Sequence, residues 1–413
     1  MKLCRFWKKN GLIYNSQHGF RKKRSCLTNF LEYIEYVSKI LDEGVPVDVI
    51  YLDFQKAFDK VPHSKLILKL ENIGIRGRLL NWIREWLRDT KQRVVLNGEC
   101  SNWESVLSGV PQGSVLGPIL FTIYINDLDE GLVNRILKFA DDAKLMSRVG
   151  KQEEVELLQE DLNRLGNWSS EWGMSFNSEK CKIMHIGTNN QKWDMSLQGK
   201  TLGEVKVEKY LGILICNDFK VAAQCAAAAK KGYQILGMMN RSFSCKSKDV
   251  LLPLYKSLVR PYLDYCIQAW RPHLKKDVEL LERVQRRGTK MIRECRELSY
   301  LERLKVCGLT TLETRRVRAD LIEVYKIVNK LEGLNEEDFF LRGNYGDTMR
   351  RGTRGNSIKL YKKGFRLDVA KYSFGNRVVN DWNLLPDSVI VAQSLNVFKG
   401  RVDDFLRNIR GLV

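Results

Sequence analysis

The sequence has 413 residues, of which 44% are hydrophobic, enough to form packed cores in roughly two to four domains. Its 69 Lys and Arg residues outnumber its 49 Asp and Glu residues, which gives a formal net charge of +20 at pH 7. This surplus favours a polyanionic partner, although charge carries no sequence specificity and a generic basic surface is the alternative.

The cysteine pattern argues against a disulfide framework and against a zinc site. The ten cysteines are scattered without a C-x-x-C pair, and the chain has only four histidines. We therefore expect reduced thiols in an intracellular protein. The N-terminal segment MKLCRFWKKNGLI lacks the apolar core of a signal peptide, and no run of about 18 apolar residues predicts a membrane span.

The hydrophobic pattern of the first half alternates between the periods of helices and strands. Apolar residues recur at helical spacing after Ser25, a candidate N-cap, and Asn97-Gly98 is typical of a hairpin turn. Strands covered by helices predict an α+β layer. In chain order we expect a helix over 27–41, a strand over 49–52, two helices within 62–88, a hairpin over 91–107 and a helix over 151–172.

After Gly212 the pattern is helical. Residues 221–239 are strong helix formers with many small side chains, which fit either close packing or an open face. Residues 250–270 predict two helical pieces or one helix kinked by its prolines. The segment DVELLERVQRRGTKMIRE predicts a helix that packs one apolar face inward and offers basic groups to a phosphate backbone; a solvated charged face is the alternative. Its basic side chains are Arg283, Arg286, Arg287, Lys290 and Arg293.

Three acidic residues stand at the ends of predicted strands. Asp53 follows an apolar run in YLDFQKAFD, and Asp141 and Asp142 lie between two apolar runs in ILKFADDAKLM. Acids at the ends of core strands usually surround a positive charge, and in phosphoryl-transfer sites that charge is a pair of divalent ions. Oxygen ligands of this kind suit Mg²⁺. A lone Asp-Asp pair, in contrast, is more often a turn or a helix cap.

A glycine- and proline-rich loop lies between the two acidic sites. The segment SGVPQGSVLGPILFTIYINDL, residues 108–128, begins with this rigid loop and continues into an apolar stretch. Such a loop allows a backbone to approach another molecule closely, and Gln112 can present an amide from it. An ordinary turn before a core helix is the alternative interpretation.

In this order the segments resemble the motifs of reverse transcriptases. YLDFQKAFDKVPH, GVPQGSVLGP and FADD resemble motifs A, B and C, with wording most similar to non-LTR retrotransposons (LINE elements) of the jockey-like and chicken-repeat type. Residues 17–30 resemble the fingers motif, 172–187 motif D and 209–215 the primer-grip motif E. Residues 374–399 resemble the C-terminal ends of these elements, so that the resemblance covers nearly the whole chain.

The resemblance implies a metal site and a fold. Asp53 and Asp141 would hold the two catalytic metal ions, and Asp142 would complete the carboxylate set. The implied cofactor is Mg²⁺, as two ions, with Mn²⁺ as the alternative. The implied fold is α+β: a polymerase right-hand palm with partial fingers, followed by a helical thumb and a C-terminal extension.

Four further residues receive roles from the resemblance. The main-chain amide of Phe54 would contact the incoming triphosphate, and Gln112 would contact the nucleotide from the motif B loop. Phe58 would be the steric gate that collides with a 2′-hydroxyl, and Lys180 would lie near the departing pyrophosphate. Phe58 as plain core and Lys180 as a solvated surface lysine are the alternatives.

The implied organisation has four parts. We expect residues 1–46 to be a remnant of the fingers, 47–209 the palm with the catalytic carboxylates, 210–335 the helical thumb and connection, and 336–413 a basic aromatic C-terminal region. Full-length elements carry an endonuclease and a basic fingers segment upstream, and neither is present in this sequence. We therefore interpret the chain as an N-terminally truncated copy.

Two functions remain open from the sequence. The first is RNA-directed DNA synthesis on an RNA template and a DNA primer, with deoxynucleoside triphosphates as substrates and no membrane partner. The implied location is the nucleus and cytoplasm, as a ribonucleoprotein that is not secreted. The second is a catalytically weak, truncated remnant that only binds RNA or an RNA–DNA duplex.

Overall fold

A computed structural model describes residues 13–88, 90–342 and 357–410. The prediction that the N-terminal segment is not a signal peptide concerns residues 1–13, of which 1–12 lie outside the described residues. The chain forms two compact units: Met1–Asn29 with Val45–Lys206, and Phe30–Gly44 with Val207–Val413. We call them unit 1 and unit 2.

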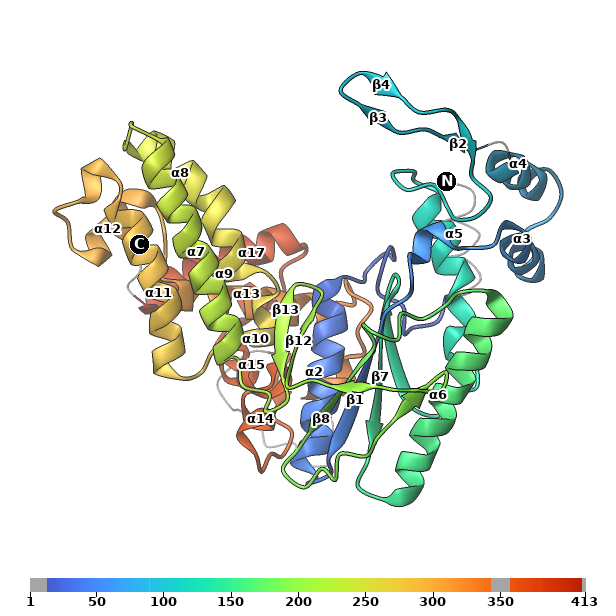
Figure 1. Cartoon of the computed structure of the whole chain (residues 1–413). Coiled ribbons are helices and arrows are strands. Elements are labelled where there is room, and N and C mark those ends of the chain that lie inside the picture. Colours follow the sequence, from blue (N-terminus) through green and yellow to red (C-terminus); the bar gives the residue numbers. More distant parts are fainter. Residues whose placement is uncertain (1–12, 89, 343–356, 411–413) are drawn as a thin grey trace. The chain divides into compact units, whose positions relative to one another are not determined.

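Unit 1 is built around a five-stranded sheet of order β11-β8-β1-β7-β6 (Figure 1). Its helices are α3 (His63–Asn72), α4 (Gly77–Arg88), α5 (Gly117–Tyr124) and α6 (Gln152–Trp172), with short turns η1 (Ala57–Asp59) and η2 (Asn126–Asp129). Its longer strands are β1 (Val47–Leu52), β6 (Arg135–Phe139), β7 (Asp142–Arg148) and β8 (Lys182–Ile186). Its two-residue strands are β2 (Lys91–Gln92), β3 (Val95–Leu96), β4 (Glu99–Cys100), β5 (Glu104–Ser105), β9 (Ser196–Leu197), β10 (Lys200–Thr201) and β11 (Gly203–Glu204).

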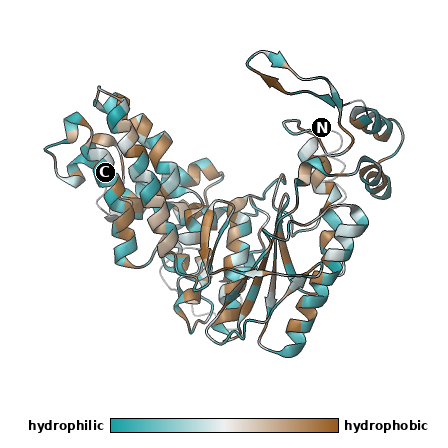
Figure 2. Cartoon of the chain, viewed as in Figure 1, coloured by the Kyte–Doolittle hydropathy of each residue, from teal (hydrophilic) through white to brown (hydrophobic). Residues whose placement is uncertain are grey.

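Strand β1 occupies the centre of the sheet because all six of its side chains are apolar or paired in the interior. It runs antiparallel to β7 on one side and to β8 on the other, and every one of its residues is buried. Helix α6 packs against β7. Figure 2 shows hydrophobic residues along the strands and hydrophilic ones on the outer side of α6, the amphipathic pattern expected of a helix that covers a sheet.

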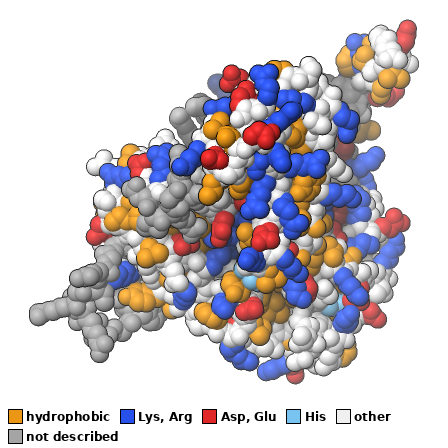
Figure 3. All heavy atoms as spheres, turned by 90° about the vertical axis from the view of Figure 1, so that its left-hand side faces the viewer, with side chains coloured by type: hydrophobic (Ala, Val, Ile, Leu, Met, Phe, Trp, Pro, Cys, Tyr) orange, Lys and Arg blue, Asp and Glu red, His pale blue; other side chains and the backbone are white. Residues whose placement is uncertain are grey.

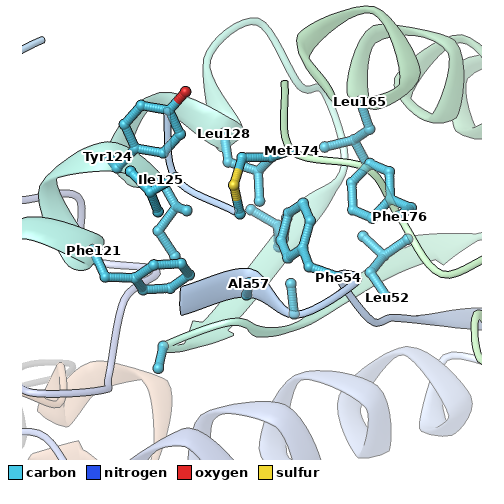
Figure 4. Packing of buried hydrophobic residues seen from close by; sticks show 14 of the residues in the cluster. Leu52, Phe54, Ala57, Phe121, Tyr124, Ile125, Leu128, Leu165, Met174 and Phe176 are labelled. Atoms are coloured by element: carbon cyan, nitrogen blue, oxygen red, sulfur yellow. The ribbon is translucent and has the colours of Figure 1, made fainter. Parts of the chain in front are cut away.

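The core of unit 1 gathers aromatic and aliphatic side chains from the strand ends, α5 and α6. Phe54 stacks on Phe176 with ring centroids 4.5 Å apart, and Figure 4 shows both rings beside Met174 and Leu165. Their backbones form an isolated antiparallel bridge. The residue that follows the acidic end of β1 is therefore anchored in the core, which limits how far Asp53 can move.

Two of the lysines buried in unit 1, Lys69 and Lys138, are each paired with an acid of the segment INDLD, residues 125–129. Lys69 Nζ lies 2.6 Å from Asp127 Oδ1 and 3.8 Å from the ring centroid of Trp172. Lys138 Nζ lies 2.6 Å from Asp129 Oδ1. Burial lowers the pKa of both lysines, to about 8 for Lys69. These pairs satisfy charges that would be costly in the interior if left alone.

Unit 2 is mainly helical. Its longer helices are α2 (Cys26–Asp42, whose first turn belongs to unit 1), α7 (Ala222–Ser242), α11 (Lys275–Lys290), α13 (Leu312–Val328), α15 (Phe374–Asn383) and α17 (Leu395–Arg410). Its shorter ones are α8 (Lys248–Leu254), η3 (Tyr255–Val259), α9 (Arg260–Asp264), α10 (Ile267–Trp270), η4 (Arg293–Cys295), α12 (Tyr300–Cys307), η5 (Glu336–Asp338), α14 (Asp368–Lys371) and α16 (Asp387–Ile390). Two hairpins complete it, β12 (Val207–Tyr210) with β13 (Ile213–Cys216), and β14 (Leu341–Arg342) with β15 (Leu360–Tyr361).

Within unit 2 a buried acid joins α2 to α15. Glu35 accepts hydrogen bonds from Ser373 Oγ and from the Gly375 amide, both at 3.2 Å. A Cβ at Gly375 would lie 2.6 Å from Glu35 Oε1, so only glycine allows this approach. Burial raises the pKa of Glu35 to about 7, against the opposing effect of the Gly375 hydrogen bond.

One expected helix ends earlier than predicted. The apolar pattern suggested a single helix that continues through Met291 and Ile292 to Arg293, but α11 ends at Lys290. Ile292 has an extended backbone (φ −71°, ψ 125°), and the Arg293 amide donates to the carbonyl of Lys246. This tertiary hydrogen bond replaces a further helical one, and Arg293 leaves the basic face of α11. The mixed helix and sheet content agrees with the α+β class.

Candidate active site

The three carboxylates lie at one edge of the central sheet. In the pairing of β1 with β7, Leu52 is opposite Ala143, so Asp53 follows β1 where Asp142 begins β7. In the β6–β7 hairpin, Phe139 pairs with Asp142. The intervening Ala140 and Asp141 form a two-residue turn, with φ +54° at Ala140. Asp53, Asp141 and Asp142 are thus brought to the same end of two neighbouring strands.

The hairpin turn is held by a segment from far upstream. Gln17, buried, accepts a hydrogen bond from the Ala140 amide at 2.9 Å through Oε1 and donates to the Ala140 carbonyl at 3.4 Å through Nε2. A Cβ at Gly19 would lie 2.4 Å from the Ala140 nitrogen, so a glycine is required there. Sequence patterns predicted no role for Gln17 or Gly19, although the resemblance of residues 17–30 to a fingers motif was the available signal.

The carboxylates are close enough to repel one another. Burial, then the charges of Asp141 and Asp53, raise the pKa of Asp142 to about 6. Burial and the charge of Asp53 also raise the pKa of Asp141. Negative charge therefore accumulates at this edge, and a bound cation would relieve the repulsion.

The backbone of Asp53 is fixed by the turn before β8. Its amide donates to Cys181 Sγ at 3.4 Å, and its carbonyl accepts from the Asn177 amide at 2.7 Å. Its side-chain Oδ2 is buried and has no hydrogen-bond partner in the described part of the chain. Lys180 Nζ lies 3.5 Å from Oδ2, an ion-pair distance without a hydrogen bond. The predicted basic residue therefore lies beside the first predicted carboxylate, although Lys180 itself is exposed.

The donor chemistry at this edge fits a divalent metal ion. Three carboxylates supply hard oxygen atoms, and Oδ2 of Asp53 is buried without a hydrogen-bond donor. Across residues 13–88, 90–342 and 357–410, however, no group of three or more His, Cys, Asp and Glu side chains is arranged so that it could hold an ion. The acids are therefore neighbours without forming a closed ligand set.

Phe58 is half-buried beside the motif B loop. Its ring stacks on Phe121 of α5, with centroids 4.2 Å apart, and meets the exposed Phe20 edge-on at 6.4 Å. Its carbonyl accepts from the Val110 amide at 2.7 Å. One side of the ring thus belongs to the core, so both the gate and the core interpretations of Phe58 stay open.

The motif B loop is clamped to the segment after Asp53. Gly109, with φ +93°, passes so close to Asp59 that a Cβ would lie 2.7 Å from its backbone. His63 Nε2 donates to the Gly109 carbonyl at 2.8 Å. Gln112, exposed, donates from Nε2 to Asp59 Oδ1 at 2.9 Å. The amide predicted to contact a nucleotide is therefore presented at the surface by a rigid loop.

In unit 2, four of the five predicted basic residues gather with three residues that were not predicted as nucleic-acid ligands. Arg283, Arg286, Arg287 and Lys290 line a hollow of about 550 Å³. It is completed by Tyr233 of α7, by Met291 and by Arg303 of α12. Arg293 is not among its lining residues.

No helix of the described residues is both long enough and apolar enough to cross a membrane.

Comparisons with known proteins agree with the motif order. The reverse transcriptase (RNA-dependent DNA polymerase) family matches residues 3–238, more than half of the chain. The RNA-directed DNA polymerase from mobile element jockey of Drosophila funebris is 27% identical over 278 residues, 63% of this chain and 30% of that protein. A probable RNA-directed DNA polymerase from transposon BS of Drosophila melanogaster is 25% identical over 300 residues, 69% of this chain and 33% of that protein.

The chain spans about a third of the length of these curated relatives. Among solved structures, apo telomerase from Candida tropicalis matches 74% of this chain and 52% of its own, with 13% identity and a TM-score of 0.41. The resemblance to reverse transcriptases of non-LTR mobile elements is confirmed by the family match and the Drosophila relatives, and the chain belongs to the reverse transcriptase (RNA-dependent DNA polymerase) family.

Proposed function

We propose that this chain carries the RNA-directed DNA polymerase centre of a non-LTR retrotransposon, with unit 1 as the palm and unit 2 as the thumb and C-terminal region. The observation that supports it is the crowding of Asp53, Asp141 and Asp142 at one sheet edge, where burial and then neighbouring carboxylate charges raise the pKa of Asp141 and of Asp142. A protein maintains such repulsion at a cost in stability, which a functional cation would offset.

In this proposal Asp53, Asp141 and Asp142 supply the oxygen ligands. Two divalent ions, Mg²⁺ by preference, would activate the primer 3′-hydroxyl and stabilise the leaving pyrophosphate. The Lys180 ammonium, 3.5 Å from Asp53 Oδ2, would add a positive charge near the departing pyrophosphate. The product is a primer longer by one deoxynucleotide, copied from an RNA template.

Two segments would position the nucleotide: the residues that follow Asp53 and the motif B loop. Backbone hydrogen bonds of Gly109 and Val110 join the loop to the residues after Asp53. The Phe54 amide would contact the triphosphate, because Phe54 is anchored in the core directly after Asp53. Gln112 would contact the nucleotide from the motif B loop. The ring of Phe58, fixed by its stacking on Phe121, would exclude a 2′-hydroxyl and so select deoxynucleotides.

Primer extension on an RNA template, with a titration of Mg²⁺ or Mn²⁺, tests the proposal. Asp141→Asn should lower the rate by at least about 10²-fold, a loss typical of removing one group that stabilises the transition state. Asp194→Asn, an equal charge change at an exposed residue of unit 1, should leave the rate unchanged.

The second candidate is a remnant that binds nucleic acid without polymerising. The absence of a closed ligand set among the described side chains favours it. Duplex binding by the wild-type chain without any extension that depends on Asp141 would support the remnant. Robust extension abolished by Asp141→Asn would exclude it.

A further inference from the structure

The turn that carries Asp141 has a backbone geometry that its own residues do not favour. Ala140 has φ +54° at the first of the two turn residues between Phe139 and Asp142. Glycine is the usual residue at such a position, because a Cβ makes the left-handed conformation unfavourable. An alanine keeps this conformation only when contacts from elsewhere in the fold hold it.

Gln17 supplies such contacts with its side chain. Its Oε1 atom accepts hydrogen bonds from the amides of Ala140, at 2.9 Å, and of Gly19, at 2.7 Å. Its Nε2 atom donates to the Ala140 carbonyl at 3.4 Å. Gln17 is only 1% exposed, so water does not compete for these hydrogen bonds. Both backbone groups of Ala140 are therefore held by a single carboxamide.

Gln17 is itself fixed by backbone pairing with β6. It forms a parallel bridge with Lys138, whose amide donates to the Ser16 carbonyl and whose carbonyl accepts from the His18 amide, both at 2.8 Å. Strand β6 is an end strand of the five-stranded sheet, so this segment covers its free edge. The carboxamide thus projects from a backbone that is anchored to the same hairpin that it supports.

The two sides of the carboxylate edge have separate backbone supports. On one side, Cys181 and Asn177 bind the amide and the carbonyl of Asp53. On the other side, Gln17 binds the residue that precedes Asp141. The position of one carboxylate relative to the other therefore depends on two independent sets of contacts.

The segment that holds the turn continues along the site. Phe20 meets the ring of Phe58, the expected steric gate, edge-on with centroids 6.4 Å apart. Residues 17–20 therefore contact both the carboxylate turn and the side chain expected to select the sugar. Their position bears on the reaction and not on a remote part of the core.

We propose that Gln17 is a positioning residue for DNA synthesis: by holding the backbone of Ala140, it keeps the Asp141 carboxylate where it can act together with Asp53. The inference rests on the proposed function, because it gives Gln17 a part in the metal chemistry of these two acids. Removing a group that orients metal ligands commonly lowers metal affinity or activity by about 10–100-fold. A displacement of about 1 Å at a reacting group has an effect of similar size.

The test replaces Gln17 by Met, which has a similar length but forms none of the three hydrogen bonds. In primer extension on an RNA template, Gln17→Met should lower kcat by about 10–100-fold. The KM for the primer–template duplex should stay unchanged, because the charges that attract a duplex lie elsewhere. Figure 3 views the side on which α8, α11 and α12 lie in Figure 1, and Lys and Arg side chains are spread across that face.

A binding measurement tests the same role without catalysis. Mn²⁺ is titrated into the full chain in the absence of nucleotide and duplex, and the free ion is measured by electron paramagnetic resonance. The Mn²⁺ binding that Asp141→Asn removes belongs to the carboxylate edge. Gln17→Met should weaken this binding by about 10–100-fold, because the released turn no longer holds Asp141 in place.

A stability control is needed, because the loss of buried hydrogen bonds also destabilises the fold. Val155, 6% exposed, packs into the core of unit 1 from the start of α6, which follows the end of β7 opposite to Asp142. Val155→Ala should lower the midpoint of thermal unfolding but leave kcat and Mn²⁺ affinity unchanged. Gln17→Asn, which withdraws the amide by one methylene, replaces Gln17→Met if that variant does not fold, and it should show smaller losses in the same direction.

Three results would overturn the inference. The first is a loss of kcat and Mn²⁺ affinity in Val155→Ala equal to that in the Gln17 variant, which would make Gln17 a structural residue. The second is a Gln17 variant with normal kcat and Mn²⁺ affinity, or with a change confined to the KM for the duplex. The third is a wild type without any Mn²⁺ binding that depends on Asp141.

The proposed function can fail separately. If the wild type does not extend a primer, while Gln17→Met still weakens the Mn²⁺ binding that depends on Asp141, the polymerase proposal fails and the role of Gln17 at the carboxylate edge stands. If extension depends on Asp141 but Gln17→Met behaves as the wild type does, only the role of Gln17 fails.

Discussion

Replacing Asp142 by Asn should stabilise the metal-free protein above pH 6. In the variant, the amide side chain takes the half-buried position of the Asp142 carboxylate but carries no charge to repel Asp141 and Asp53. In the wild type, burial and these two charges raise the pKa of Asp142 from 3.8 to about 6. A raised carboxyl pKa means that the folded state binds its proton more tightly than the unfolded state does. Its contribution to stability is therefore lost as the pH rises from about 4 to about 6.

The magnitude follows from the size of the shift. About two pKa units correspond to a ceiling of about 3 kcal/mol at 1.36 kcal/mol per unit. Because the side chain is partly exposed, water screens the repulsion, and about 1–2 kcal/mol is the expected gain for Asp142→Asn at pH 8. Below pH 4 the wild-type carboxyl is protonated in both states, and the difference between the two proteins should disappear.

The assay is urea unfolding of both proteins at several pH values in the presence of a chelator. Comparing the variant with the wild type at each pH removes the contributions of Glu35 and other groups with raised pKa values, since both proteins share them. Added Mg²⁺ should stabilise the wild type more than the variant. A variant less stable than the wild type at pH 8, or a difference that does not change with pH, would refute the electrostatic reasoning.

Two further substitutions test neighbouring features. Phe58→Val should raise the use of ribonucleotides relative to deoxynucleotides in primer extension, because the ring stacked on Phe121 would no longer block a 2′-hydroxyl; an unchanged preference would assign Phe58 to the core. Asp127→Asn should lower the free energy of unfolding by roughly 3 kcal/mol, since it leaves the Lys69 ammonium buried without its counter-charge. Urea unfolding measures this loss, Asp194→Asn is the surface control, and a loss no larger than the control's would contradict it.

Local sequence signals predicted the elements that depend on local physics. The helix expected over 27–41 is α2, and the two helices split by glycines are α3 and α4. The turn expected at Asn97-Gly98 joins β3 to β4 with φ +50° and +90°, the left-handed geometry that these residues tolerate best. Turn chemistry and hydrophobic period depend on neighbouring residues only, so these elements could be predicted without knowledge of the fold.

Features that depend on distant partners were missed. The helix α11 ends where the Arg293 amide donates a hydrogen bond to the Lys246 carbonyl. The hydrophobic period of the sequence does not reveal such a bond between distant residues. The burial of Arg303 depends on how α11 and α12 pack. Asp127 and Asp129 lie in an otherwise apolar stretch, which indicates that they have partners in the interior. The sequence does not indicate that these partners are Lys69 and Lys138.

The supports of the carboxylate edge act on backbone atoms and leave the acidic oxygens available. Cys181 and Asn177 bind the amide and carbonyl of Asp53, and Gln17 binds both backbone groups of Ala140 in the hairpin turn. The structural acid Asp127, in contrast, has its oxygen 2.6 Å from a buried lysine. The fold thus pairs the acids that it uses for packing with buried lysines, whereas the three acids at the sheet edge crowd one another, and Asp53 has only the exposed Lys180 at 3.5 Å as an ion-pair partner within the described residues. A cation from solution would relieve the repulsion among these carboxylates, and that is why we assign the chemistry to this edge rather than to the better-paired acids nearby.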